Sequence, residues 1–146
     1  MNNDPKPAEI LLVEDDALSA RLMQEVLKDH AGALHLTVAQ DGEQALTILH
    51  RTGDSAAAPR PDLILLDLNL PKKDGFAVLA ELKEDPNLKR IPVVVLTTSQ
   101  APADIQRSYD LHANCYIVKP RDLAHLMTIL RSITDFWLTA VTLPAA

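Results

Sequence analysis

Five short apolar runs are spaced along the chain. They are rich in Ile, Val and Leu, are bounded by polar or turn residues, and cover residues 10–13, 34–39, 63–66, 93–96 and 115–118. A run of consecutive apolar positions this short is typical of a strand that is covered on both faces. The pattern therefore predicts five strands, four of them fully apolar and one, residues 34–39, with a partial alternation.

Helical periodicity fills the segments between these runs, because apolar residues recur there at spacings of three and four. Asp16 and Asp74 are the expected caps of the first and third helices. Pro102 is expected to open a weaker fourth helix. The core-facing positions are predicted to be Leu18, Leu22, Met23, Val26 and Leu27; Ala45, Leu46 and Leu49; Phe76, Leu79 and Leu82; Ile105 and Leu111; and Leu123, Leu126, Met127, Leu130, Ile133 and Trp137.

The order of these elements, strand then helix five times over, indicates one α/β domain. Such alternation gives parallel strands, right-handed crossovers and helices on both faces of the sheet. Residues 51–61 form the one long loop and are interpreted as a surface insertion. Ligands of open α/β sheets bind outside the carboxyl ends of the strands, so the reactive side chains are expected there.

Composition narrows the class of protein. The chain has 146 residues, 47% of them apolar, which suits a single globular domain. The net charge is −6 at pH 7 and no basic run is present, so we expect no nucleic-acid partner. Cys115 is the only cysteine and no apolar run approaches ~20 residues, which indicates the cytoplasm and no membrane segment. Residues 1–8 are expected to form a disordered leader.

Reactive residue types follow four of the predicted strands. Glu14 and Asp15 follow the first, Asp67 the third, Thr97 the fourth and Lys119 the fifth. Two carboxylates about 4 Å apart repel by roughly 4 kcal/mol at an effective dielectric near 20, so a cation is needed between them. An all-oxygen ligand set favours Mg²⁺.

Asp67 is the candidate nucleophile, because a carboxylate can attack a phosphoryl group and form an aspartyl phosphate. Lys119 and the Thr97 hydroxyl would then compensate the phosphoryl oxygens. The four glycines are isolated, so no phosphate-binding loop supports nucleotide hydrolysis.

These residues lie in segments that resemble the receiver domain of two-component response regulators. The segments are ILLVEDD (10–16), LILLDLNLPKKDG (63–75), PVVVLTTS (92–99) and CYIVKP (115–120), and the resemblance spans roughly residues 9–136. It implies a flavodoxin-like doubly wound sheet in the order 2-1-3-4-5, with an extended C-terminal helix and tail. It also implies a phosphoryl group donated to Asp67 by a sensor histidine kinase.

The resemblance assigns further roles to single residues. Glu14 and Asp15 become the acidic metal pair, with Glu14 in place of the commoner Asp, and the main-chain carbonyl of Asn69 becomes a further metal ligand. Lys119 becomes the phosphate-binding lysine with a cis peptide to Pro120. Thr97 and Tyr116 become a switch pair that changes the surface of the last two helices and strand five.

The C-terminal segment, residues 121–144, is similar to single-domain response regulators that partner phytochrome histidine kinases. Its apolar arc is wider than one sheet can cover, so two outcomes are open. The tail, residues 137–146, could fold back on its own domain. We expect instead a homodimer interface, which includes Ile129, Phe136, Trp137 and Leu138.

Three functions compete at this stage. The first is a phosphorylated signalling switch that is not an enzyme toward outside substrates. The second is a phosphatase of the haloacid dehalogenase type, which needs an acid two residues after the nucleophile, where this chain has Asn69. The third is an unphosphorylated interaction module, which would be expected to lack Asp67, Lys119 or the acidic pair. The residues favour the first.

Overall fold

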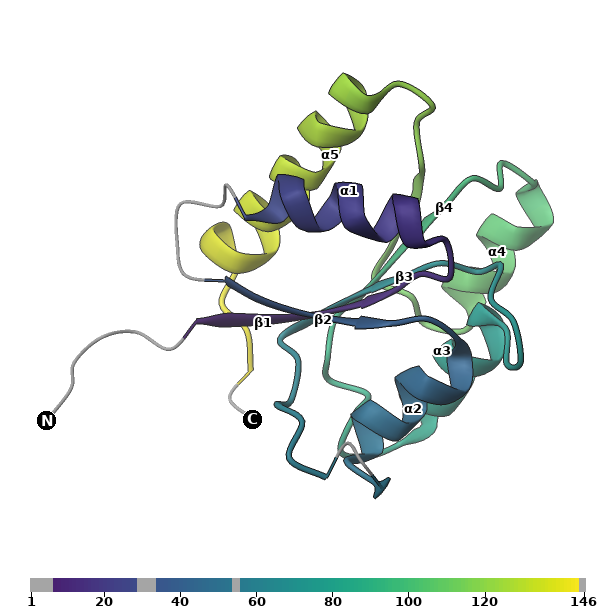
Figure 1. Ribbon diagram of the computed structural model, residues 1–146. Helices are drawn as coiled ribbons and strands as arrows, with labels where there is room; N and C mark the ends of the chain where they lie inside the picture. Colours follow the sequence, from purple (N-terminus) through teal and green to yellow (C-terminus); the bar gives the residue numbers. More distant parts are fainter. Residues whose placement is uncertain (1–6, 29–33, 54–55, 145–146) are drawn as a thin grey trace, which may run out of the picture.

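The computed structural model describes residues 7–28, 34–53 and 56–144. Within them the chain forms a three-layer α/β domain in which a central sheet lies between two layers of helices (Figure 1). Most of the predicted leader, residues 1–6, lies outside the described part of the chain.

The sheet has five parallel strands in the order β2-β1-β3-β4-β5, as predicted. The strands are β1 (Ala8–Val13), β2 (Leu34–Ala39), β3 (Leu63–Leu66), β4 (Val93–Thr97) and β5 (Cys115–Val118). Three match the predicted ranges at both ends. β1 begins earlier than expected, at Ala8, because Ala8 pairs with Leu34 of β2, and β4 extends to Thr97.

The helices follow the predicted alternation with the strands. They are α1 (Ala17–Leu27), α2 (Gly42–His50), α3 (Gly75–Glu84), α4 (Pro102–Asp110) and α5 (Leu123–Asp135), and α5 continues into a π-helical turn, η2 (Phe136–Ala140). The predicted caps are present: Asp16 accepts from the Leu18 N–H and Asp74 from the Ala77 N–H.

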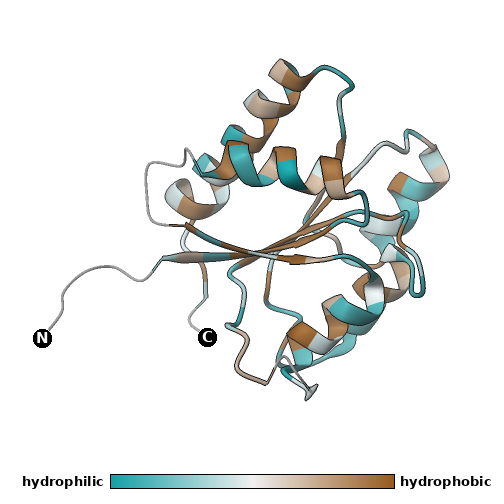
Figure 2. Ribbon diagram, viewed as in Figure 1, coloured by the Kyte–Doolittle hydropathy of each residue, from teal (hydrophilic) through white to brown (hydrophobic). Residues whose placement is uncertain are grey.

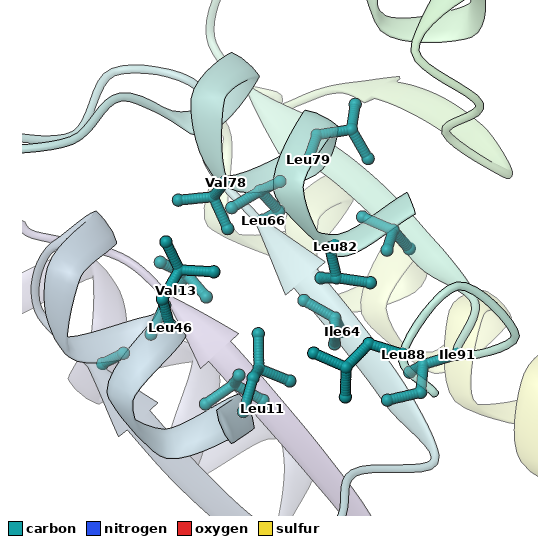
Figure 3. Packing of buried hydrophobic residues seen from close by; sticks show 14 of the residues in the cluster. Leu11, Val13, Leu46, Ile64, Leu66, Val78, Leu79, Leu82, Leu88 and Ile91 are labelled. Atoms are coloured by element: carbon teal, nitrogen blue, oxygen red, sulfur yellow. The ribbon is translucent and has the colours of Figure 1, made fainter. Parts of the chain in front are cut away.

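Two apolar cores separate the layers. One lies between the sheet and α2 and α3, where side chains such as Leu11, Ile64 and Leu82 meet (Figure 3). The other lies between the opposite face of the sheet and helices α1 and α5. Figure 2 shows the strands as a largely hydrophobic middle layer. Burial on both faces explains the continuous apolar sequences of β3, β4 and most of β1, whereas the edge strands β2 and β5 are mostly half-buried.

Three leucines predicted to face the core are exposed: Leu18 and Leu22 of α1, and Leu123, which is 46% exposed at the start of α5. Leu18 and Leu22 of α1 are 65% and 36% exposed, whereas Met23 and Leu27 are buried. At ~100° per residue, Leu18 and Leu22 lie roughly 110–150° from the centre of the buried stripe, and so they point away from the sheet. The two leucines leave an apolar strip on the surface of α1.

The expected cis peptide before Pro120 is also absent, since no peptide bond among the described residues is cis. The trans form is the ordinary preference of an X–Pro bond by about 0.5–1 kcal/mol. Here the Lys119 N–H donates to the Thr97 carbonyl oxygen at 2.6 Å, which holds the segment beside β4.

The C-terminal tail packs on its own domain as far as Pro144. Leu143 and Pro144 line a small cavity with Arg60 and Arg90, at the edge where the strands begin. Leu143 also lines a larger groove with Pro7. The described tail therefore folds back on its own domain, while Phe136 at the end of α5 stays exposed. Among the described residues, no helix is both long and apolar enough to cross a membrane.

Candidate functional site

Three carboxylates meet at the carboxyl ends of β1 and β3. Glu14 and Asp15 directly follow β1, and Asp67 directly follows β3, which pairs with β1 in parallel. One carboxylate oxygen from each of the three lies within 4.8 Å of the others. Glu14 and Asp67 are buried, whereas Asp15 is exposed. The cluster therefore has a buried floor and one side open to solvent.

Lys119 places an ammonium group beside these carboxylates. Its Nζ lies 3.3 Å from Glu14 Oε2 and 4.0 Å from Asp67 Oδ2. The main-chain hydrogen bond from Lys119 to Thr97 extends the pairing of β5 with β4, and so it brings the lysine to the same edge of the sheet. The side chain is about one-tenth exposed, which strengthens its attraction to the carboxylates.

Burial raises the pKa of Glu14 from 4.5 to about 7, and the hydrogen bond with Asp67 adds to the rise. The charge of Lys119 opposes the rise but does not cancel it. Neutral pH therefore leaves Glu14 able to keep a proton when no further cation is bound. A divalent cation would replace that proton, because it would neutralise both carboxylates at once.

The donor set fits Mg²⁺. The three clustered side chains offer only carboxylate oxygens, and the open side beside Asp15 leaves room for water and a phosphoryl oxygen. Asn69 lies next to them, and its N–H donates to Asp67 Oδ1 at 3.3 Å, which orients that carboxylate. The role of the Asn69 carbonyl as a ligand remains a prediction.

The hydroxyl of Thr97 is shielded from water and lacks a hydrogen-bond partner among the described residues. The residue is fully buried at the end of β4, and its Oγ1 has no hydrogen-bond partner among the described residues. A buried hydroxyl left unsatisfied costs about 1–3 kcal/mol. The Thr97 hydroxyl lies at the edge of the sheet that carries Asp67 and Lys119. An unsatisfied donor there is suited to bind an oxygen atom of a ligand.

Gly75 shapes the loop that carries Asp67. Its N–H donates to the Leu68 carbonyl at 3.0 Å. A Cβ at this position would lie 2.6 Å from Leu68 Cα and closer still to the Asp67 carbonyl oxygen. Only glycine lets the first turn of α3 approach the main chain of the candidate nucleophile this closely.

Tyr116 on β5 points to the loop after β4. Its hydroxyl donates to the Ser99 carbonyl at 2.8 Å, and the Ser99 hydroxyl donates to Asp104 Oδ2 at 2.6 Å. The expected switch residues Thr97 and Tyr116 are thus linked through a segment two residues long. Sequence reasoning missed Tyr109, whose hydroxyl accepts from the Tyr116 N–H at 3.1 Å.

The predicted interface residues lie at the far end of α5 and not at the acidic cluster. Phe136 is 53% exposed, and Ile129, Trp137 and Leu138 are half-buried against the core under α5. The rings of Phe136 and Trp137 pack edge to face, with centroids 5.2 Å apart. A groove of about 550 Å³ runs beside them and is lined by Ile129, Ile133 and Cys115 among others.

A family comparison matches residues 10–131 to the response regulator receiver domain. Among curated proteins, the chain is 54% identical over 145 residues to the response regulator Rcp1 of Synechocystis sp. PCC 6803, and the match covers 99% of this chain and 97% of Rcp1.

Two solved structures of response regulators are also similar to this chain. The phosphorylated cyanobacterial phytochrome response regulator RcpA superposes with a TM-score of 0.93 at 52% identity, covering 96% of this chain and all of RcpA. The Mn²⁺-bound form of Rcp1 superposes with a TM-score of 0.91 at 54% identity, covering 95% of this chain and all of that chain.

Proposed function

The chain belongs to the response regulator receiver domain family, and from that premise we propose that it accepts a phosphoryl group on Asp67 from a sensor histidine kinase. It is a signalling protein of two-component systems and not an enzyme that acts on outside substrates. The observation that carries the proposal is the meeting of Asp67, two further carboxylates and the Lys119 ammonium at one edge of the sheet.

The proposed step is an in-line transfer. A carboxylate oxygen of Asp67 forms a bond to phosphorus, the bond from phosphorus to the histidine nitrogen breaks, and its electron pair returns to the imidazole ring. A bound Mg²⁺ supplies charge compensation for the phosphoryl oxygens, and Glu14, Asp15, Asp67 and the Asn69 carbonyl would hold it.

Two side chains of this chain would then receive the phosphoryl group. The Lys119 ammonium, 4.0 Å from Asp67 before transfer, would pair with one phosphoryl oxygen. The Thr97 hydroxyl would donate to another and so gain the partner that it lacks. Catalytic duty in both phosphorylation and later hydrolysis is thus proposed for Asp67, Lys119 and Thr97, and the movement of Thr97 would be passed to Tyr116.

A mass measurement tests the assignment. Incubation with acetyl phosphate and Mg²⁺ should add one phosphoryl group to the intact protein, and Asp67→Asn should abolish the addition. Asp110→Asn, an exposed aspartate on α4, is the matched control and should be phosphorylated normally. Uptake by Asp67→Asn, or full uptake in excess chelator, would contradict the proposal.

We further propose that the kinase is a phytochrome-type photoreceptor. The support is the relatedness to RcpA, described as a phytochrome response regulator, across nearly the whole chain. Phosphoryl transfer from a purified phytochrome kinase should be faster than transfer from a kinase of another sensor class. The exposed Leu18 and Leu22 lie on α1, a few residues after Asp15, and offer an apolar contact for such a partner. Faster transfer from the unrelated kinase would count against this partner.

The C-terminal residues support a homodimer, which also stays a proposal. The groove beside Ile129, Phe136 and Trp137 is largely apolar and open, and the described tail leaves Phe136 uncovered. Leu138, which follows Trp137 and is half-buried, would extend the contact. Phe136→Ser should reduce the molecular mass measured by sedimentation to that of one chain, whereas Leu123→Ser, an exposed leucine at the other end of α5, should not. An unchanged mass for Phe136→Ser would remove the dimer.

The remaining expectations follow from family and composition. We propose that residues 9–136 act as the receiver domain, that the protein works in the cytoplasm as a single-domain regulator, and that it binds no nucleic acid. The net charge of −6 supports the last point. The phosphatase alternative finds no support, because Asn69 donates its N–H to Asp67 and carries no acid.

A further inference from the structure

Helix α4 is joined to the rest of the domain by hydrogen bonds at both of its ends. At its first turn, Asp104 accepts from the Ser99 hydroxyl. At its last turn, the Tyr109 hydroxyl accepts from the Tyr116 N–H of β5. The Tyr116 hydroxyl closes the circuit, because it donates to the Ser99 carbonyl. α4, the loop before it and β5 therefore form one hydrogen-bonded ring.

The position of the Tyr116 N–H explains why it needs Tyr109. Among the described residues β5 pairs only with β4, so no strand of this part of the chain lies along its second edge. The Lys119 N–H points toward β4, where it donates to Thr97. Successive residues of a strand alternate in direction, and Tyr116 is three residues earlier, so its N–H points to the open edge. The Tyr109 hydroxyl supplies the missing acceptor there.

Packing alone does not account for a tyrosine at position 109. The residue is 48% exposed, whereas its neighbour Ser108 is fully buried. Arg107, next along the helix, is directed to α3 and lies 4.2 Å over the Phe76 ring. The hydroxyl of Tyr109 thus gives the end of α4 a specific link to the main chain of β5.

We propose that Tyr109 is a positioning residue that anchors the last turn of α4 to β5, so that phosphorylation moves the first turn of α4 about a fixed end. This inference rests on the proposed function of Asp67. A shift of Thr97 toward a phosphoryl oxygen would displace Ser99, which holds both Asp104 and the Tyr116 ring. With the far end of α4 fixed by Tyr109, that displacement becomes a rotation of the helix and not a general loosening.

Amide hydrogen exchange, followed residue by residue by NMR, tests the anchor in two arms. In the unphosphorylated protein, Tyr109→Phe keeps the ring and removes the acceptor, so the Tyr116 N–H should exchange about fivefold faster, the loss expected from one hydrogen bond. Gln106→Ala, an exposed position on α4, is the control and should leave this rate unchanged. An unchanged rate in Tyr109→Phe would overturn the anchor.

The second arm compares each protein before and after treatment with acetyl phosphate and Mg²⁺. In the wild-type protein and in Gln106→Ala, exchange should change at residues 103–106 and stay constant at residues 107–110. In Tyr109→Phe the change should spread to residues 107–110. A purely structural role would alter the starting rates of the variant but not the response to phosphorylation.

Failures of the two proposals are distinguishable. Normal phosphoryl uptake with the same response in Tyr109→Phe and the wild-type protein would overturn only the role of Tyr109. Absence of uptake at Asp67 in the wild-type protein would refute the proposed function, and with it any part for Tyr109 in the response.

Discussion

At the scale of single residues, the acidic edge is arranged at a cost to stability. Thr97 keeps a buried hydroxyl without a partner, and Glu14 keeps a carboxyl in a place that disfavours its charge. Both costs would fall when a cation and a phosphoryl group arrive, because these supply the missing charge and acceptor. Two measurements on the unphosphorylated protein can detect the costs directly.

Thr97→Val should stabilise the unphosphorylated domain. The change keeps the shape and removes an unsatisfied hydroxyl, so the free energy of unfolding should rise by about 1 kcal/mol in a urea titration. Thr134→Val is the matched control: Thr134 is also buried, but its hydroxyl donates to the Leu130 and Arg131 carbonyls, so its loss should bring no gain. The phosphoryl group on Asp67 should form more slowly in Thr97→Val. A loss of stability in Thr97→Val would show that the hydroxyl is satisfied.

The metal-free protein should lose stability as the pH rises from about 4.5 to about 7. The folded-state pKa of Glu14, about 7, exceeds the unfolded value of 4.5, so in this window the folded state binds more protons and its advantage disappears as they leave. The expected fall is on the order of 3 kcal/mol, measured by urea unfolding in chelator. Glu14→Gln should flatten the profile, and 10 mM Mg²⁺ should restore stability at pH 8. A stability that instead rises across this window in chelator would contradict the raised pKa.

At the scale of the elements, most strands and helices could be predicted because one physical cause, burial or helix capping, determines each sequence pattern. Strands covered on both faces must be continuously apolar, and the Asp16 and Asp74 carboxylates cap helices by accepting from main-chain N–H groups two or three residues later. The prediction of the buried face of α1 was wrong because Leu18 and Leu22 repeat with helical spacing on the solvent side. Spacing alone does not identify the side of a helix that packs on the sheet.

Some residues of the candidate site could be predicted from the sequence, and others could not. The edge that gathers Glu14, Asp15, Asp67 and Lys119 follows from parallel strands, whose carboxyl ends coincide. Tyr109 could not be found, because its partner is a main-chain N–H and no side-chain pattern marks it. The lack of a hydrogen-bond partner for the Thr97 hydroxyl likewise could not be predicted, because it depends on three-dimensional packing.

Gly75→Ala should disturb the loop between β3 and α3. The added methyl group would overlap main-chain atoms of Asp67 and Leu68, which cannot move like a flexible side chain. We expect a loss of about 1–3 kcal/mol in the free energy of unfolding and slower phosphorylation by acetyl phosphate.

Gly53→Ala separates these two effects. Gly53 has open space around it but a φ of +55°, so the variant should lose about 1 kcal/mol through backbone strain alone. Its phosphorylation rate should match that of the wild-type protein. Equal phosphorylation rates for the two glycine variants would show that the close approach at Gly75 does not position Asp67.

At the scale of the whole molecule, the described end of the tail, residues 141–144, packs across the edge of the sheet where the strands begin. Val141 and Leu143 are half-buried there, close to the segments that lead into β1, β3 and β4. This part of the tail is separated by the full length of a strand from the edge of the sheet that carries Glu14, Asp15 and Asp67. Stability and phosphorylation should therefore respond separately to changes in the tail.

Leu143→Ala should lower the free energy of unfolding by about 1 kcal/mol through lost apolar burial, measured by urea titration, while the phosphorylation rate stays unchanged. Leu18→Ala removes a side chain of the same size that is 65% exposed, and it should have little effect on stability. Equal losses in the two variants would show that the tail contributes no packing of its own.

The described chain enters and leaves the domain on the same side. Pro7 and Leu143 line one groove, and Pro144 lies beside Arg60 at that edge, opposite the carboxyl ends of all five strands. A strand of four to six residues at ~3.3 Å per residue separates that edge from Asp67 by roughly 13–20 Å. A fluorescent reporter or a surface linker fused at either terminus should consequently leave Asp67 open to a docking kinase, so immobilised or tagged protein can be used to time the transfer in real time.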